Sequence, residues 1–334
     1  MPEGVEALGA LGVELSATGA ERLEGIRFID EAREVCASFP QATGLGVRRT
    51  ALHSALIARA EQVGVRLIWG TLVEAIHQGE VVAGGSTIRC RFAICADGLN
   101  SSLRRMAGLG AVKTRRRRFG FRSHYRVPPW SPFVEVYWAD CGQIYVTPVS
   151  AEEICVALLT SDPHARLETV LGSFPGLRDK LADARGEVRR MGGITSTSRL
   201  QSVARGCIAV VGDASGTADA ITGDGLSLGF QQAIALADAM AAGVPGRPVF
   251  GLPRRGELAR YQQAHERISR LPRAMGELLL LLDGRPRLRR RVFSVFNQSP
   301  ELFARLLALH TRSISPLELG AGDCLRFGWK LLRA

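Results

Sequence analysis

The stretch from 206 to 242 most constrains how this chain can fold, because it joins a strand pattern to a helix pattern through glycines. Cys207 to Val211 is a short, β-branched apolar run typical of a buried strand, and it stops at Gly212-Asp213. From Gly225 onward, apolar residues recur at helical spacing and predict a helix with one buried face. The predicted buried face consists of Leu226, Phe230, Ala233, Ile234, Ala237 and Met240.

The joint between this strand and this helix has the features of a ligand site. Gly223 and Gly225 leave the first turn of the helix uncovered by side chains, so its N–H groups and partial positive charge can face an electron-rich ligand. Asp213, at the end of the strand, is placed to accept hydrogen bonds from a polyol. The ribityl chain and ring of a flavin combine these two properties. The alternative is a core strand and a core helix joined by a flexible loop.

A second joint of the same kind occurs earlier in the chain. The apolar residues from Thr87 to Ile94 lead into Cys95-Ala96-Asp97-Gly98, which again delivers a carboxylate next to a glycine. Ser101 follows at the position that caps a short helix. Further upstream, Arg49 begins a helical pattern.

These stretches resemble motifs of the hydroxylase-type FAD oxidoreductases, the superfamily of p-hydroxybenzoate hydroxylase and geranylgeranyl reductase. The later stretch resembles the family's G-D-A-A and G-x-G motif at Gly212, Asp213, Ala214, Gly216, Gly223 and Gly225. Asp219 and Ala220 stand where the family usually has a proline. The earlier stretch resembles the A-D-G-x-x-S-x-x-R motif at Asp97, Gly98, Ser101 and Arg104, and the R-x-x-L-x-x-x-L helix is matched by Arg49, Leu52 and Leu56.

The resemblance implies an α/β fold with a Rossmann-like FAD-binding domain, an inserted antiparallel-sheet substrate domain and a C-terminal helical tail. The FAD-binding residues that it implies are Arg49, Asp97, Gly98, Gly212, Asp213, Gly223, Gly225 and Leu226. Asp97 and Gly98 would lie near the pyrophosphate, and Gly212 and Asp213 near the ribityl chain and the ring. No catalytic side chain and no metal site is assigned, because the histidines are isolated and no cysteine–histidine cluster is present.

The family's usual amino-terminal unit is not recognisable in this sequence. That unit is a strand, a G-x-G-x-x-G turn and a helix that cradles the FAD pyrophosphate. Gly44-Leu45-Gly46 does not fit the pattern, because Val, Arg and Arg follow it. We therefore expect an FAD domain truncated at its amino terminus by about 35 to 45 residues, with apolar sheet edges exposed.

The order of these patterns predicts four segments. They are the first part of the FAD domain (1–112), the substrate-binding sheet (113–200), the second part of the FAD domain (201–246) and a C-terminal helical region (247–334). Alternation over Arg118 to Val127 and the apolar runs after it predict the sheet. Short strands are expected at Val65–Trp69, Thr71–Ile76, Glu80–Ala83 and Thr87–Ile94, with a hairpin turn at Gly84-Gly85.

Basic residues are concentrated late in the chain. The formal net charge is +11, and most of the excess follows Gly251. The run Arg115 to Arg118 is expected to be a surface loop. After a break at Pro245 to Pro248, helices are expected at Gly256–Ser269, Leu271–Leu282, Leu288–Phe296 and Pro300–His310, with Pro272 separating the first two.

The tail also bears on possible partners. Leu278 to Leu282, followed by several arginines, predicts a basic amphipathic surface that could make peripheral contact with a membrane, although a packed helical tail explains it equally well. Nucleic acid is the less favoured partner. No apolar run has the length of a membrane span and no signal segment follows Met1, so we expect a cytoplasmic protein, with membrane association as the alternative.

Three functions are consistent with the sequence. The A-D-G motif favours an FAD-dependent, NAD(P)H-driven monooxygenase that acts on an apolar or aromatic small molecule. The turn Thr222 to Gly225, the missing proline and the apolar basic tail favour a reductase of isoprenoid-like double bonds. The third hypothesis is a truncated, catalytically silent flavoprotein, or a basic protein that binds membranes or nucleic acid. FAD is the expected cofactor and NAD(P)H the expected electron donor.

Overall fold

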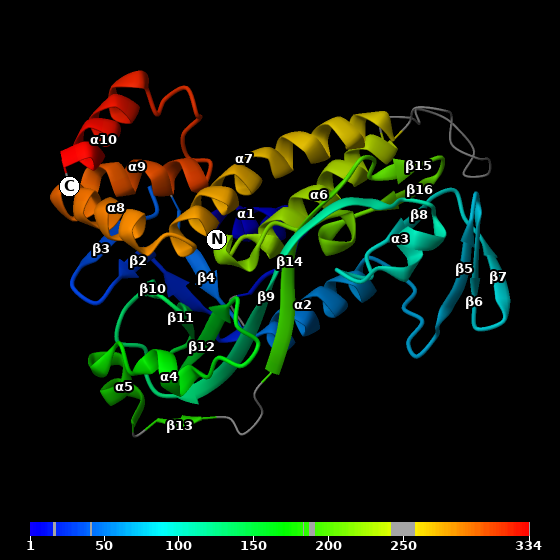
Figure 1. Ribbon diagram of the computed structural model, residues 1–334. Helices are drawn as coiled ribbons and strands as arrows, with labels where there is room; N and C mark the ends of the chain where they lie inside the picture. The colour runs from blue at the N-terminus through cyan, green and yellow to red at the C-terminus, as the bar shows by residue number, and fades with distance from the viewer. Residues whose placement is uncertain (16–17, 41, 183, 187–190, 242–257, 334) are drawn as a thin grey trace. The chain divides into compact units, whose positions relative to one another are not determined.

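The computed structural model describes residues 1–15, 18–40, 42–182, 184–186, 191–241 and 258–333 (Figure 1). The chain forms two compact units. Unit 1 consists of Met1–Arg59, Arg117–Thr195 and Met275–Ala334, and unit 2 consists of Ala60–Arg116 and Ser196–Ala274. The break expected at Pro245 to Pro248 lies outside the described residues.

These units group the chain differently from the four segments expected from the sequence. Strand β2 (Gly25–Ile29) pairs in parallel with β10 (Phe133–Ala139), so the amino-terminal residues belong to the large sheet. The C-terminal region also divides, because helix α7 (Ala259–Asp283) contributes residues to both units. The glycine turns of the two predicted flavin motifs fall together in unit 2.

Unit 1 is built on an eight-stranded sheet. As the apolar runs after Val127 predict, β10, β11 (Gly142–Ser150) and β12 (Glu153–Thr160) form an antiparallel meander. The strand order is β13-β9-β12-β11-β10-β2-β3, and β14 also pairs with β9. The remaining strands of this sheet are β3 (Glu34–Ser38), β9 (Ala111–Arg126), β13 (Arg185–Gly186) and β14 (Met191–Leu200). A separate antiparallel pair is formed by β1 (Glu21–Leu23) and β4 (Gly44–Gly46).

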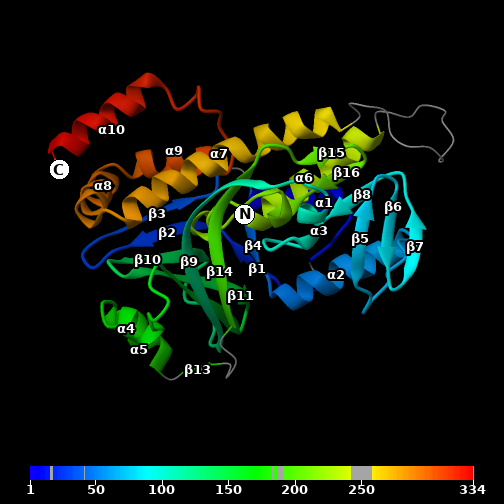
Figure 2. The same cartoon turned by 45° about the vertical axis from the view of Figure 1, so that its right-hand side comes forward.

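Two short helices cover one face of this sheet. Side chains from β11 and β12, among them Ile144 and Ile154, form a buried cluster with α4 (Leu167–Leu171) and α5 (Pro175–Ala182). Both helices lie next to the β10–β12 meander in Figures 1 and 2. Because successive strand residues point to opposite faces, the remaining apolar residues of the meander are available to pack on the other side.

The other face packs against the C-terminal helices α8 (Pro286–Gln298) and α9 (Pro300–His310), which lie beside β2 and β3 (Figure 2). The ring of Phe28 in β2 lies 5.4 Å from that of Trp138 and 5.9 Å from that of Phe293 in α8. Trp138 and Phe293 are each 1% exposed. These rings make the aromatic core on this face of the sheet.

The basic run from Arg115 to Arg118 is not a surface loop, as the sequence suggested, but part of β9. The Arg118 side chain is 2% exposed. It donates a hydrogen bond to Gln143 and forms an ion pair with Asp283, in which the N–O distance is 3.3 Å. The prediction was wrong because a buried guanidinium is stable when carboxylate and amide partners converge on it, and the sequence pattern did not show those partners.

The C-terminal helices differ from the prediction in two respects. Residues 259 to 283 form one helix, α7, with Pro272 inside it, so Pro272 does not separate two helices. A further helix, α10 (Ala321–Arg333), was not predicted.

Within the described ranges, no helix combines the length and the apolar character that crossing a membrane requires.

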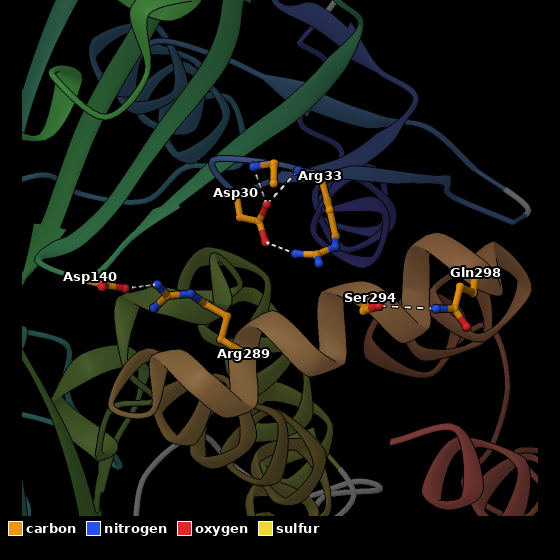
Figure 3. Close-up of polar contacts among 7 residues, drawn as sticks. Asp30, Arg33, Asp140, Arg289, Ser294 and Gln298 are labelled. Atoms are coloured by element: carbon orange, nitrogen blue, oxygen red, sulfur yellow. Dashed lines mark hydrogen bonds and ion pairs between the residues drawn. The ribbon is translucent and has the colours of Figure 1, made fainter. Parts of the chain in front are cut away.

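Some of the arginines in this tail serve the fold. Arg289 of α8 is 2% exposed and donates a hydrogen bond to Asp140 (Figure 3). Asp140 also forms an ion pair with Arg290. In the same region Asp30 accepts hydrogen bonds from the backbone N–H groups of Ala32 and Arg33 and forms an ion pair with the Arg33 side chain (Figure 3). The basic composition of the tail is therefore explained in part by ion pairs within unit 1.

Unit 2 contains two small sheets. In the first, β16 (Ile208–Val210) pairs in parallel with β8 (Ala93–Cys95) and antiparallel with β15 (Ala204–Arg205). β8 is an edge strand of this sheet, and its Ile94 side chain is 46% exposed. The second sheet is an antiparallel meander of β5 (Val73–His77), β6 (Glu80–Ala83) and β7 (Ser86–Arg89).

Two details of the predicted strands in unit 2 are corrected. Val65 to Trp69 is irregular rather than a strand, and the side chains of Val65 and Trp69 are 50% and 64% exposed. Thr87 to Ile94 is not one strand, because β7 and β8 are separate. The hairpin turn at Gly84-Gly85 is confirmed, and both glycines have the positive φ that such a two-residue turn requires.

We expect replacement of Gly46 by alanine to destabilise unit 1. A Cβ at Gly46 would overlap the carbonyl oxygen of Pro148, so the strands would have to shift, at a cost of about 1–3 kcal/mol. The matched control is Gly9→Ala in helix α1 (Pro2–Ala10), where an added Cβ meets no atom within 4 Å. Urea denaturation should show a loss of stability for the first variant and a gain of roughly 0.5–1 kcal/mol for the second. Equal stability of the two variants would contradict this packing.

Candidate functional site

The candidate site begins where β16 ends. After Val210 the chain enters a short 3-10 turn, η2 (Gly212–Ser215), and Gly212 has a φ of +59°, which favours glycine. Gly216 follows with a φ of +112°, and a Cβ there would lie 2.9 Å from the backbone oxygen of Ser198. Both glycines are therefore required by the local backbone, whether or not a ligand binds.

Helix α6 (Gly225–Ala241) holds this turn through Gln232, which is 3% exposed. The Gln232 Oε1 atom accepts hydrogen bonds from the Gly212 N–H, at 2.8 Å, and from the Ser215 hydroxyl, at 3.1 Å. The helix approaches closely at Gly229, where an added Cβ would lie 3.8 Å from the Gly212 Cα. The turn is thus fixed to the helix by a buried side chain and by close backbone packing.

The buried face of α6 is not the one that the sequence predicted. The buried residues are Ser227, Leu228, Gln232, Leu236 and Ala239. Leu226, which was predicted to be buried and to contact the cofactor, is 37% exposed. The helix is apolar over most of its circumference, so periodicity did not identify the buried face, and the hydrogen bonds of Gln232 account for a polar residue in the core.

The second predicted motif is joined to the first by a buried arginine. Arg104 of α3 (Ser102–Met106) is 8% exposed, and its Nη1 donates a hydrogen bond to the carbonyl oxygen of Ala214, at 3.0 Å. Ser101 caps this helix as predicted, because its Oγ accepts from the Arg104 N–H at 2.9 Å. The A-D-G-x-x-S-x-x-R stretch and the G-D-A-S turn therefore meet in unit 2.

Asp97 serves the start of the same short helix. Its carboxylate accepts hydrogen bonds from the Ser101 hydroxyl and, at 3.1 Å, from the Leu103 N–H. Partial burial raises the pKa of the Asp97 carboxyl, but hydrogen bonds from Ser101, Leu103 and Ser102 outweigh it and leave that pKa below its ordinary value. Gly98, with a φ of +80°, makes the tight turn between strand and helix.

A polar stripe on α7 faces the turn after β16. Its members are spaced four residues apart, which keeps them on one face of a helix. The Tyr261 hydroxyl donates to the Val210 carbonyl at 2.7 Å, and the His265 Nε2 lies 2.8 Å from the Ser215 Oγ. Ser269 and Arg273 continue the stripe and line a cavity. Tyr261, His265 and Ser269 are 0%, 2% and 4% exposed.

His265 is held in its neutral form. Burial, assisted by the nearby charge of Arg273 and opposed by Glu266, lowers the pKa of the imidazole to about 4. The Ser215 hydroxyl has one proton and two pure acceptors beside it, Gly212 O at 2.8 Å and Gln232 Oε1. Because the one Ser215 proton is directed to these two acceptors, the Ser215 Oγ is left to accept from the His265 Nε2–H, which places the imidazole proton on that nitrogen.

The cavity has a volume of about 20 Å³, enough for one water-sized group. Three of the predicted cofactor residues line it, namely Gly212, Asp213 and Gly225. The other lining residues are Gly216, Thr217, Ala218, Leu228, Gln232, Ser269 and Arg273. The site thus combines a carboxylate, the start of a helix and a cation around one small space.

The remaining predicted residues lie elsewhere. Gly223 has a φ of +68° and ends the short turn η3 (Ala220–Thr222) immediately before α6. Asp97, Gly98 and Leu226 lie in unit 2 but are not among the residues that line the cavity. Arg49 begins helix α2 (Arg49–Gln62) in unit 1, where its side chain is exposed.

Sequence reasoning missed the groups that support the cavity. They are Gln232, His265, Ser269 and Arg273. The signal that could have found three of them is the Y-x-x-x-H-x-x-x-S-x-x-x-R spacing from Tyr261, which puts polar residues on one face of an otherwise ordinary helix. The histidines were instead treated as isolated, and Pro272 was read as the end of a helix.

The observed geometry fits a polyol linked to an electron-rich group. The chain offers a carboxylate acceptor in Asp213, N–H groups at the start of the 17-residue helix α6, and glycines where an added Cβ meets no atom within 4 Å. Ser269 adds a buried hydroxyl to the cavity wall. In the part of the chain that the structure describes, no group of three or more histidine, cysteine, aspartate or glutamate side chains is arranged for a metal ion.

The chain has a mixed α/β fold, and comparison with known proteins shows that flavoproteins share this fold. No protein-family model matches the sequence. A Rhodococcus erythropolis protein named "Putative 2-heptyl-3-hydroxy-4(1H)-quinolone synthase AqdB1" is 30% identical over 213 residues, which are 58% of this chain and 54% of that protein. The matched part therefore spans about half the length of that relative.

Two solved structures show the likeness in three dimensions. A triple mutant of the flavin-dependent brominase Bmp2 matches with a TM-score of 0.74 and 16% identity, over 92% of this chain and 83% of that one. The 2-methyl-3-hydroxypyridine-5-carboxylic acid oxygenase MHPCO matches with a TM-score of 0.69 and 19% identity, over 84% and 80%. The chain has the fold that these flavin-dependent enzymes share, and the α/β flavoprotein fold predicted from the sequence is confirmed.

The depressed pKa of His265 predicts a specific loss of stability in acid. An unfolded histidine takes up a proton below about pH 6.5, whereas the folded imidazole does so only near pH 4, so the unfolded chain binds more protons between these values. The stability that His265 contributes is therefore full above pH 6.5 and falls as the pH drops to 4. Urea denaturation across this range should show the advantage of the wild type over His265→Gln shrinking with falling pH. A constant difference would contradict a buried neutral His265.

Proposed function

We propose that this protein is an FAD-dependent monooxygenase that hydroxylates an aromatic, largely apolar small molecule and takes its electrons from NAD(P)H. The observation that supports this most directly is the meeting of the two motif turns through the Arg104 contact to Ala214, with Gly212, Asp213 and Gly225 around one cavity. The shared fold with flavin-dependent oxygenases supports the same proposal. A single motif would be weak support, whereas two motifs joined in space are much stronger.

In this proposal the chain supplies binding and orientation. When FAD is bound, Asp213 would accept hydrogen bonds from the ribityl hydroxyls, and the first N–H groups of α6 would donate to an electron-rich group of the cofactor. The glycines at 212 and 225 leave room for the cofactor to approach the backbone closely, because an added Cβ there meets no atom within 4 Å. Ser215, Gln232 and His265 keep the turn in one conformation.

When bound, FAD supplies the redox chemistry, which no side chain of the cavity can provide. The overall reaction consumes one O₂, one NAD(P)H and one proton for each C–H bond converted to C–OH, and it releases water and NAD(P)⁺. The neutral imidazole of His265, fully engaged with Ser215, acts as a structural donor rather than as a base.

The substrate class rests on the comparisons. The Rhodococcus relative is named for a hydroxyquinolone product, and the oxygenase MHPCO for a hydroxypyridine substrate. Both names denote nitrogen-containing aromatic rings, and this agrees with the apolar or aromatic substrate expected from the sequence. We therefore extend the proposal to a nitrogen heteroaromatic ring as the group that is hydroxylated.

Halogenation is the second candidate function. The brominase Bmp2 shares the fold over 92% of this chain, so the fold also accommodates the use of bromide in place of direct oxygen transfer to the substrate. Product analysis separates the two candidates, because hydroxylation adds an oxygen atom and bromination adds a bromine atom. A reductase of isoprenoid-like double bonds would add two hydrogen atoms and consume no O₂.

The cofactor assignment predicts that Asp213→Ala weakens FAD binding at least about tenfold, because a charged acceptor of hydroxyl hydrogen bonds is lost. The measurement is a fluorescence titration of FAD with purified protein. Asp238→Ala is the matched control, since it removes the same charge from an exposed position on α6. Circular dichroism should show both variants folded, and unchanged FAD affinity in Asp213→Ala would refute the assignment.

The reaction type predicts NAD(P)H oxidation coupled to O₂ consumption when a quinolone or hydroxypyridine carboxylate is added to the FAD-loaded protein. The product should carry one additional oxygen atom, and that atom should come from ¹⁸O₂ rather than from labelled water. Bromide should leave the product unchanged. A brominated product would favour the second candidate, and substrate turnover without O₂ would favour a reductase.

A further inference from the structure

Helix α7 brings to the cavity a hydroxyl that has no partner in the protein. Ser269 is 4% exposed, and among the described residues no group forms a hydrogen bond with its Oγ. Leaving a buried hydroxyl unpaired is unfavourable, and most such groups in folded proteins find a partner. Because Ser269 lines the cavity, a ligand that enters the cavity can supply that partner.

One turn further along the same face of α7, Arg273 brings a positive charge. Its side chain is partly buried and lines the same cavity, and no described residue forms an ion pair or hydrogen bond with its guanidinium. Burial and then the like charge of Arg199 lower the pKa of Arg273, and the attraction of Glu266 is the smaller effect. A guanidinium stays protonated under these conditions, so an anion in the cavity would relieve the unfavourable environment.

We propose that Ser269 and Arg273 form a subsite for an oxyanion, the head of a carboxylate or a phosphate. The hydroxyl and the guanidinium supply donors from α7, and the start of α6 at Gly225 supplies N–H groups from the other helix. The cavity holds one water-sized group, so a single anionic oxygen enters and the rest of the head group lies toward the partly open side.

The cavity also orients its ligand. Asp213 lies in the same lining and repels an anion, and it is the natural acceptor for hydroxyl groups. A ligand with hydroxyls and an anionic oxygen is therefore held with its hydroxyls toward Asp213 and its charge toward Arg273. The pyrophosphate of FAD and the free carboxylate or phosphate of a substrate share this chemistry. Only the first of these sources rests on the proposed function.

The first experiment uses inorganic phosphate alone, so it does not depend on flavin binding. Phosphate should raise the thermal unfolding midpoint of the wild-type chain, because a ligand that binds only the folded state stabilises it. Arg273→Gln should raise the dissociation constant for phosphate about tenfold or more. Arg270→Gln removes the same charge from an exposed position on the same helix and should leave phosphate binding as in the wild type.

Ser269→Ala tests the subsite without risk to folding. Removing a buried hydroxyl that has no partner should leave the unliganded chain as stable as the wild type, or more stable. The same change should weaken phosphate binding, because the ligand loses a donor. A merely structural serine would show the opposite pattern, with lower stability of the free chain and unchanged phosphate affinity.

The second experiment separates the two sources of the anion by comparing FAD with riboflavin, which lacks the phosphates. If the subsite takes the cofactor's pyrophosphate, Arg273→Gln weakens FAD binding and leaves riboflavin binding unchanged. If it takes a substrate's anion, both flavins bind as in the wild type and only the phosphate response is lost. A wild type that binds phosphate through Arg273 but binds neither flavin refutes the proposed function and supports the subsite. Equal phosphate, FAD and riboflavin affinities in Arg273→Gln and Arg270→Gln overturn the subsite.

Discussion

The hydrogen bonding of one buried turn is the constraint on which the candidate site depends. Ser215 is fully buried at the end of the Gly212–Ser215 turn, and its hydroxyl can be satisfied only by partners inside the protein. Gln232 of α6 and His265 of α7 provide them, so two successive helices must arrive at the same strand end. A third contact, from Arg104 to Ala214, adds the short helix α3. The polar core of unit 2 therefore determines how its elements meet.

Helix α7, which completes this polar core, also contributes a positive charge to the cavity beside it. Along α7, the Tyr261 hydroxyl bonds to the end of the strand and His265 bonds to the turn. Ser269 and Arg273 line the cavity. The neutral state of His265 belongs to this arrangement, because burial and the charge of Arg273 both disfavour its protonation. Positive charge is thus confined to the cavity end of the stripe. The positions that bond to the turn and those that line the cavity are separated by a single helical turn.

The sequence predicted the regularly patterned strands and helices well, but it did not predict which residues pack or form hydrogen bonds around them. Alternation located β9, the apolar runs after it located β10 to β12, and the strand–glycine–helix joints at Asp97 and Asp213 are where they were expected. The periodicity of α6 did not identify its buried face, because apolar residues surround the helix and a bonded glutamine is buried instead. The sequence predicted a surface loop at Arg118, because no local pattern shows that Gln143 and Asp283 pair with its guanidinium. These errors share one cause, which is that long-range polar pairing overrides local pattern.

Most residues of the two motifs have a structural role that requires no cofactor, so the motifs alone are weak evidence that a cofactor binds. Asp97 and Ser101 cap α3, Arg104 fastens α3 to the second turn, and Gly212 and Gly216 adopt backbone angles that disfavour other residues. Each of these roles stabilises unit 2 by itself. Asp213 and Gly225 are different: the side chain of Asp213 is exposed at the cavity, and an added Cβ at Gly225 would meet no atom within 4 Å. Under the proposed function, Asp213 and Gly225 are therefore positions where the motif would contact the cofactor directly, because both line the cavity.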